Sequence, residues 1–209
     1  MNIAAQNNSG TPPRFVMSQS HDTHYHPLLK HALEPDDSRV RAYAAAIDLA
    51  QTSSRMAGRC RFGLDASSYT ELLNRHFPGA PACYRLAQDT AKRHETDEFD
   101  DVVLLLLNHM RNDSPENRWL AHAIAAGCMG DDHLWQDLGL CNRQALSTLL
   151  ADGFPELYAR NTQGMRWKKF FYRQLCEQSG AKVCRSPSCQ VCSEYNHCFG
   201  SEEDETWQH

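Results

Sequence analysis

The chain has 209 residues, of which 41% are hydrophobic and 22% are charged, and its formal net charge is -5 at pH 7. This length suffices for one domain whose core holds it together without disulfides. The negative charge argues against nucleic acid as a partner, because duplex binding requires a concentrated basic surface. No apolar run approaches the roughly 20 residues that a helix needs to cross a membrane.

The compartment is predicted from the start of the chain and from the cysteines. Residues 1–14 lack the basic start and apolar core of a secretion signal, so we expect a cytoplasmic protein. Disulfides are rare in the cytosol, and we therefore interpret the nine cysteines as reduced thiols and metal ligands.

Four regions are expected along the chain. Residues 1–36 are predicted to form a flexible polar leader with the histidines His21, His24, His26 and His31. Imidazoles bind transition metals, but this segment offers no framework to hold them, and we interpret it as solvated. Residues 37–183 are predicted to form a helical domain, residues 184–200 a cysteine loop, and residues 201–209 an acidic tail.

The first helices are predicted by apolar periodicity. An amphipathic helix is expected from Ser38 to Met56, because apolar residues recur at positions i, i+3, i+4 and i+7 and Asp36 and Asp37 precede them. A shorter helix is expected from Ser68 to Phe77, where a Pro-Gly-Ala-Pro run stops it, and a weak one over residues 81–94.

The middle of the chain predicts two antiparallel helices. The apolar run Val102 to Leu107 is rich in leucine and follows two aspartates, which favours a helix, and a helix apolar on all sides must be buried. Ser114 is expected to cap the next helix and Pro115 to occupy its first turn. That helix should run from Glu116 to Met129, with alanines that allow close contact.

The remaining helices lead to the cysteines. Asn142 is expected to cap a helix that ends near Gly153, and another turn should cover Glu156 to Arg160. A final helix that begins near Trp167 and buries Phe170 and Phe171 delivers the chain to the cysteine loop. The sequence therefore predicts an all-α helical bundle with a C-terminal irregular cysteine loop.

Four cysteines in this loop are spaced C-x4-C-x2-C-x5-C: Cys184, Cys189, Cys192 and Cys198. Converging thiolates suit tetrahedral zinc or an iron-sulfur cluster. Structural zinc sites usually split their ligands into two distant pairs, whereas no gap here exceeds five residues. The first three cysteines have the ligand spacing of plant-type ferredoxins. The pattern favours an iron-sulfur cluster and leaves zinc open.

Further cysteines and histidines are weaker candidates. We interpret Cys60 and Cys83 as small buried hydrophobes. Cys176 is either a fifth ligand or simply buried, and His197 could contribute to the site from beside a ligand cysteine. Three further residues either face the cluster across the bundle or serve structure alone: Cys128, Cys141 and His133.

Basic residues gather on and after the last helix: Arg166, Lys168, Lys169, Arg173, Lys182 and Arg185. They are either a solvated face or cations that stabilise an anionic thiolate cluster and an oxyanion brought to it. Asp131, Asp132 and His133 lack a nucleophile, so no catalytic arrangement emerges and we expect a carrier rather than an enzyme.

Several segments between Trp119 and Gly200 resemble the NifQ family. They read WLAHAIAA from Trp119, HLWQDLGL from His133, MRWKKFFYRQLC from Met165, and the cysteine loop up to Gly200. Residues 98–101 are similar as well, whereas the leader and the acidic tail are not. The spacing of the four cysteines is this family's hallmark.

The resemblance implies a protein that supplies molybdenum for the iron-molybdenum cofactor of nitrogenase. It implies a molybdenum-iron-sulfur cluster of Mo-3Fe-4S type, or a 4Fe-4S cluster, with Cys184, Cys189, Cys192 and Cys198 as ligands. The implied partners are the nitrogenase iron protein and the scaffold complex on which the cofactor is built. A one-electron iron-sulfur redox protein without molybdenum and a zinc-stapled helical interaction module remain alternatives.

Overall fold

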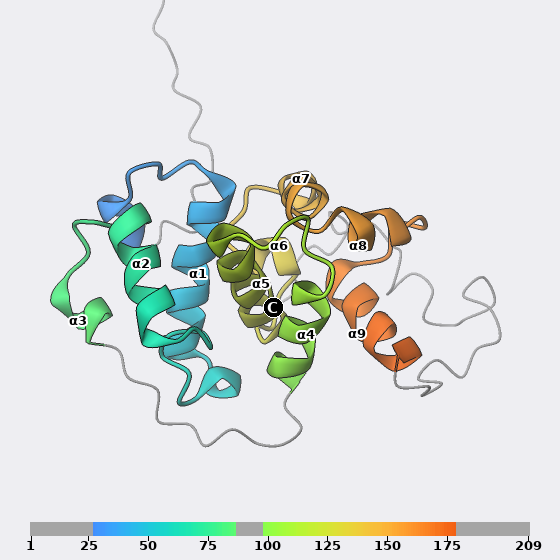
Figure 1. Ribbon diagram of the computed structural model, residues 1–209, viewed down its shortest axis with the longest axis horizontal. Coiled ribbons are helices and arrows are strands. Elements are labelled where there is room, and N and C mark those ends of the chain that lie inside the picture. The colour runs from blue at the N-terminus through green and yellow to red at the C-terminus, as the bar shows by residue number, and fades with distance from the viewer. Residues whose placement is uncertain (1–26, 87–97, 179–209) are drawn as a thin grey trace, which may run out of the picture.

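The computed structural model describes residues 27–86 and 98–178, in which helices are joined by turns and loops and no strand occurs (Figure 1). The all-α prediction is confirmed over these residues. The helices are η1 (Pro27–His31), α1 (Ser38–Thr52), η2 (Ser54–Met56), α2 (Ala66–His76), α3 (Ala82–Arg85), α4 (Glu98–Leu107), α5 (Pro115–Cys128), α6 (Leu134–Asp137), α7 (Arg143–Gly153), α8 (Pro155–Arg160) and α9 (Trp167–Gln178). Most of the predicted leader, the cysteine loop and the acidic tail lie outside the described residues.

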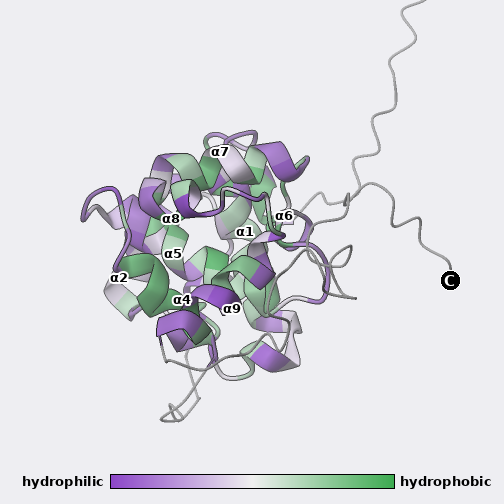
Figure 2. Ribbon diagram, turned by 90° about the vertical axis from the view of Figure 1, so that its right-hand side faces the viewer, coloured by the Kyte–Doolittle hydropathy of each residue, from purple (hydrophilic) through white to green (hydrophobic). Residues whose placement is uncertain are grey.

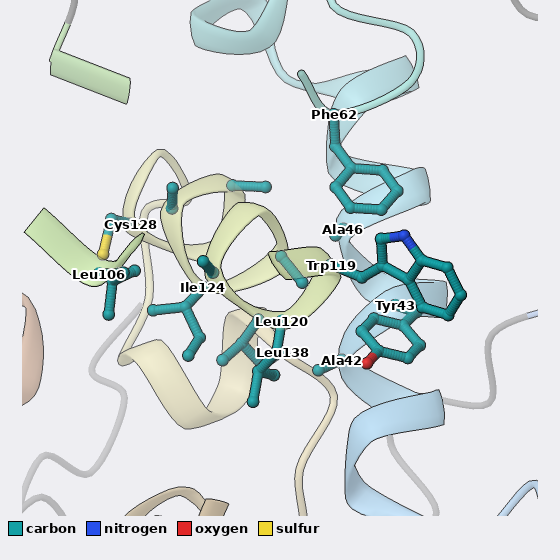
Figure 3. Packing of buried hydrophobic residues seen from close by; sticks show 14 of the residues in the cluster. Ala42, Tyr43, Ala46, Phe62, Leu106, Trp119, Leu120, Ile124, Cys128 and Leu138 are labelled. Carbon is teal, nitrogen blue, oxygen red and sulfur yellow. The ribbon is translucent and has the colours of Figure 1, made fainter. Parts of the chain in front are cut away.

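Helix α5 forms the centre of the bundle. It packs against α1 on one side and α4 on the other, with α2 and α6 also in contact (Figure 1). Figure 3 shows Trp119 directed towards Tyr43 and Ala46 of α1, while Cys128 lies near Leu106 of α4. The alanines of α5 are fully buried and admit these neighbours closely, as the sequence predicted. A helix enclosed on so many sides fixes the positions of the others.

The start of α5 is set by local hydrogen bonds. The hydroxyl of Ser114 accepts the amide of Asn117 at 3.3 Å, and Pro115 occupies the first turn, so both predictions for this terminus are confirmed. The buried amide of Asn117 donates to the side chain of Asn112 and accepts a hydrogen bond from Arg39 of α1. The start of α5 is thereby tied to the preceding turn and to α1.

Helix α1 starts at Ser38, as predicted, but ends at Thr52 rather than Met56. The carboxylate of Asp37 accepts the backbone amides of Arg39 and Val40 and caps the helix. Ser53 then takes an extended conformation, with φ -81° and ψ 128°, before the short helix η2. The segment from Ser38 to Met56, which was predicted as one amphipathic helix, is therefore two helices, α1 and η2.

Two apolar segments behave differently from expectation. Leu28 and Leu29 of η1 are buried, so packing begins before residue 37, where the helical domain was expected to start. In α4, Leu104 is 59% exposed, which corrects the expectation that this helix is buried on all sides. Helix α4 packs against α5 and α9, and its remaining side faces solvent.

Over the described ranges, no helix is long and apolar enough to span a membrane.

Gly63 supplies a sharp test of packing beside α4. Its φ is +82°, and a Cβ there would come within 2.6 Å of Phe99 Cε1 and 3.0 Å of His122 Nδ1. Gly63→Ala is expected to lower the free energy of unfolding by about 2–4 kcal/mol, from left-handed backbone strain together with overpacking. Urea denaturation measures the loss.

Gly164→Ala is the matched control, because Gly164 has φ +66° but a Cβ at this position would meet no atom within 4 Å. The free energy of unfolding of Gly164→Ala should fall by only about 1 kcal/mol, because backbone strain is the only cost. Equal losses in the two variants would show that packing against Phe99 adds nothing.

Candidate functional site

The four predicted cluster ligands, Cys184, Cys189, Cys192 and Cys198, lie outside the described residues. Of the remaining cysteines, Cys128 is buried, Cys60 and Cys176 are half-buried, and Cys83 and Cys141 are exposed. The prediction of a buried residue is therefore wrong for Cys83. The described part of the site is α9, the helix that leads towards the cysteines.

Aromatic side chains anchor the first half of α9. Trp167, Phe170 and Phe171 are buried, and the rings of Trp167 and Phe170 meet edge to face with centroids 5.6 Å apart. Tyr158 of α8 stacks on Trp167 at 6.1 Å. Figure 2 shows α9 from outside, with hydrophilic and hydrophobic residues mixed along it. This end of α9 is part of the core.

A buried ion pair fixes the same end of α9 to α6. Lys168 Nζ donates to Asp137 Oδ2 at 2.5 Å and to the carbonyl oxygen of Gly130 at 2.7 Å. The two charged side chains are only 17% and 7% exposed. A side chain on Gly130 would overlap the Asp137 carboxylate, so glycine is required there. Burial raises the pKa of Asp137, and the hydrogen bond from Lys168 opposes that increase.

Cys128 lies beside this ion pair at the end of α5. Burial raises the pKa of its thiol to about 12, so the thiol is protonated near neutral pH and acts as a small hydrophobe. Tyr172 of α9 donates to the Cys128 carbonyl oxygen at 3.4 Å. Within the described residues, Cys128 therefore contributes to packing at the end of α5.

The described residues supply no metal site of their own. Within residues 27–86 and 98–178, no three histidine, cysteine or acidic side chains come together as a metal site. His133 instead begins α6, where its backbone amide donates to Gln136 Oε1 at 3.2 Å.

The predicted basic face is divided among different roles. Arg166 is buried, Lys168 forms the ion pair with Asp137, and the exposed Arg173 pairs with Glu177 one turn later. Lys182 and Arg185 lie outside the described residues. Sequence reasoning missed that Lys168 has a buried partner, since Asp137 is 31 residues away and no local pattern connects the two.

A cleft that the sequence did not predict lies between the end of α8 and α9. It has a volume of about 450 Å³. Its lining is mainly polar: Arg160, Asn161, Thr162, Gln163, Met165, Phe170, Arg173, Gln174 and Glu177. Hydrogen-bond donors from two guanidinium groups and three side-chain amides therefore surround one space next to the helix that leads to the cysteines.

Known proteins similar to this chain all point to one family. The NifQ family model matches residues 42–200, a range that includes all four cysteines of the loop. Protein NifQ of Azotobacter vinelandii is 47% identical over 152 residues, which cover 67% of this chain and 77% of that protein. A NifQ homolog of Sinorhizobium fredii is 43% identical over 145 residues, or 69% of this chain and 63% of that protein.

Protein NifQ of Rhodobacter capsulatus is 38% identical over 143 residues, which cover 68% of this chain and 77% of that protein. No solved structure matches. The resemblance predicted from the second half of the sequence is thereby confirmed and extends into α1. Because the family model spans well over half of the chain, the chain belongs to the NifQ family.

Proposed function

We propose that this chain carries molybdenum in an iron-sulfur cluster and supplies it for the iron-molybdenum cofactor of nitrogenase. The observation that carries the proposal is the match to the NifQ family over a range that contains Cys184, Cys189, Cys192 and Cys198. These four thiolates are the proposed cluster ligands. The cluster is cargo, so the protein acts as a carrier and not as an enzyme.

The chemistry of the ligands supports this cargo. Molybdenum as an oxyanion is a hard species that soft thiolates bind poorly, whereas reduced molybdenum bridged by sulfide suits them. A loop of four cysteines with gaps of two to five residues can wrap a cluster of several metal ions more easily than a single zinc ion. The proposed partners are the nitrogenase iron protein and the cofactor scaffold complex, in the cytoplasm.

The described structure supports separate roles for the helical bundle, which maintains the fold, and the cysteines, which would bind the metal. Helix α9 is held in the core by Trp167, Phe170 and the Lys168 ion pair, and Cys184 follows its last residue by only six positions. The bundle can thus remain folded whether or not the cysteines hold metal. Loss of the cargo should therefore be separable from loss of the fold.

The test is metal analysis of protein purified without oxygen from cells supplied with molybdate. Iron, molybdenum, zinc and sulfide are counted per chain, and circular dichroism reports the helices. Wild type should contain iron, sulfide and molybdenum, and Cys189→Ala should lose most of all three while it keeps its helix content.

Cys83→Ala is the matched control, because this exposed cysteine lies outside the loop and should not affect metal content. A Cys189→Ala protein with full molybdenum would contradict the proposed ligand set. Zinc without sulfide in wild type would favour a zinc-stapled interaction module instead.

The ferredoxin-like spacing of Cys184, Cys189 and Cys192 favours one second candidate, a one-electron iron-sulfur redox protein. The same analysis separates it from the carrier. It would contain iron and sulfide but no molybdenum, and it would show a reversible redox couple.

A further inference from the structure

The cleft between α8 and α9 is not explained by the proposed cysteine site. Its walls are the turn from Arg160 to Met165 and the outer side of α9 from Phe170 to Glu177. We propose that this cleft binds a tetrahedral oxyanion. Its identity as molybdate, bound before reduction, rests on the proposed function.

The turn that forms one wall is rigid. Asn161 Oδ1 accepts the backbone amide of Met165, and Asn161 Nδ2 donates to the Met165 carbonyl oxygen, both at 2.8 Å. From α7, Arg143 donates to the carbonyl oxygens of Gly164 and Met165 at 2.6 and 3.1 Å. The polar side chains of Thr162 and Gln163 are therefore carried on a preformed frame, which lowers the entropy cost of binding a ligand.

The donors of the opposite wall already converge on an anion. Arg173 Nε donates to one oxygen of the Glu177 carboxylate at 2.8 Å, and Gln174 Nε2 donates to the other at 2.9 Å. From across the cleft, Arg160 Nη1 lies 3.5 Å from Gln174 Oε1. The Glu177 carboxylate thus marks a position where an oxyanion would find two donors from α9, while Arg160 adds positive charge at the facing wall through its contact with Gln174.

An external oxyanion can compete with the carboxylates now present. Arg160 pairs with Glu156 and Arg173 pairs with Glu177, each one turn away on the same helix, and all four side chains are about half exposed. Exposed ion pairs of this kind contribute little free energy and exchange readily with solvent. A tetrahedral oxyanion offers two oxygens to each guanidinium at once, a geometry that arginine favours over lysine.

The position of the cleft fits a role before cluster formation. Glu177, at its edge, precedes Cys184 by seven residues, so the chain itself keeps them within about 25 Å. An oxyanion held in the cleft would be concentrated near the thiolates that later receive the metal. The cleft would recognise charge and shape, while the cysteines would bind the reduced form.

The experiment is equilibrium dialysis of the full, metal-free chain against molybdate in a phosphate-free buffer of low ionic strength. The Arg160→Gln and Arg173→Gln double variant should bind molybdate about tenfold more weakly or worse, because two charged donors are lost. Glu177→Gln should bind it about threefold more tightly, because the internal competitor loses its charge.

Arg118→Gln is the matched control, since Arg118 is a similarly exposed arginine paired with Asp113 and neither residue lines the cleft, so the substitution should not change the affinity. Competition by sulfate and phosphate separates the possible sources. If sulfate and phosphate displace molybdate as well as tungstate does, the cleft is a site for tetrahedral oxyanions in general. If only tungstate, the near-isosteric analogue of molybdate, displaces it, the cleft is a site for molybdate. Unchanged affinity in the double variant and in Glu177→Gln would overturn the proposal.

Cys189→Ala in the same dialysis separates this proposal from the cysteine site. Retained binding in Cys189→Ala and lost binding in the arginine double variant would support the cleft. The reverse pattern would overturn the cleft and leave the cysteines as the site of molybdenum. Binding in the cleft by a protein that never purifies with molybdenum, iron and sulfide would instead refute the proposed carrier function.

Discussion

Replacement of Lys168 by methionine is expected to lower the free energy of unfolding by about 3–5 kcal/mol, because it leaves the Asp137 carboxylate buried without its cation. The Gly130 carbonyl oxygen loses a hydrogen bond in the same substitution. Methionine keeps most of the length of the lysine side chain, so packing changes little. Urea denaturation at pH 7 measures the loss.

The loss in Lys168→Met should depend on pH. Burial already raises the pKa of Asp137 above that of an unfolded aspartate, and without Lys168 the pKa rises further. A folded state with the higher pKa binds the proton more tightly, so its stability contribution is present below about pH 4 and is lost as pH rises through the folded pKa. The variant should therefore approach wild-type stability on acidification.

Two comparisons test the buried charge as the cause. Adding Asp137→Asn to Lys168→Met removes the charge and should recover part of the lost stability at pH 7. Lys169→Met removes the neighbouring lysine of α9, which is not part of this ion pair, and should change stability by about 0.5 kcal/mol or less. A deficit in Lys168→Met that stays constant with pH would contradict the explanation.

The second large effect is expected for Trp119→Ala, with a loss of about 3–5 kcal/mol. Trp119 is 1% exposed and meets the rings of Tyr43 and His76 edge to face, at centroid distances of 6.3 and 5.9 Å. The guanidinium of Arg75 lies 5.3 Å from its ring centroid. Removal of the Trp119 ring leaves a cavity between α5 and the residues that it contacts on α1 and α2, Tyr43 and His76. Thermal and urea unfolding report the loss.

His76 provides an independent readout of that cavity. Burial, together with the charge of Arg75, holds the pKa of His76 below its usual range. Water entering the space left by Trp119 should raise this pKa towards the ordinary value, and an NMR titration of the histidine ring measures the change. Trp119→Phe retains an aromatic ring and should lose less stability and shift the pKa less. An unchanged His76 pKa in Trp119→Ala would show that the site collapses and stays dry.

The sequence predicted helices well where the signal was local. Ser114 and Pro115 mark the start of α5 because capping needs only neighbouring residues, and Asn142 does the same for α7, where its side chain accepts the amide of Ala145. The start of α2 was placed two residues late because the cap, Asp65, lies before the apolar pattern begins. Leu104 was misjudged because exposure of one side of α4 depends on which helices pack beside it.

For the candidate site as well, the sequence predicts the features that depend on neighbouring residues and misses those that depend on tertiary contacts. The spacing of the four cysteines predicts a thiolate site because all of its ligands lie within one short segment. The Lys168 ion pair joins residues far apart in sequence, and the cleft combines a turn after α8 with the outer side of α9. Both depend on how α9 docks, which no residue spacing in the sequence encodes.

Burial along α9 decreases from its start to its end. Phe170 and Phe171 are enclosed, whereas Arg173, Glu177 and Gln178 are exposed. Hydrogen-bonded backbone amides from Phe170 onward in the buried half of α9 should exchange their hydrogens with solvent only when the whole domain opens, while those of the last turn should exchange through local fraying. The final turn of α9 can therefore open without unfolding the core. Side chains of this turn can therefore rearrange while the rest of the domain stays folded.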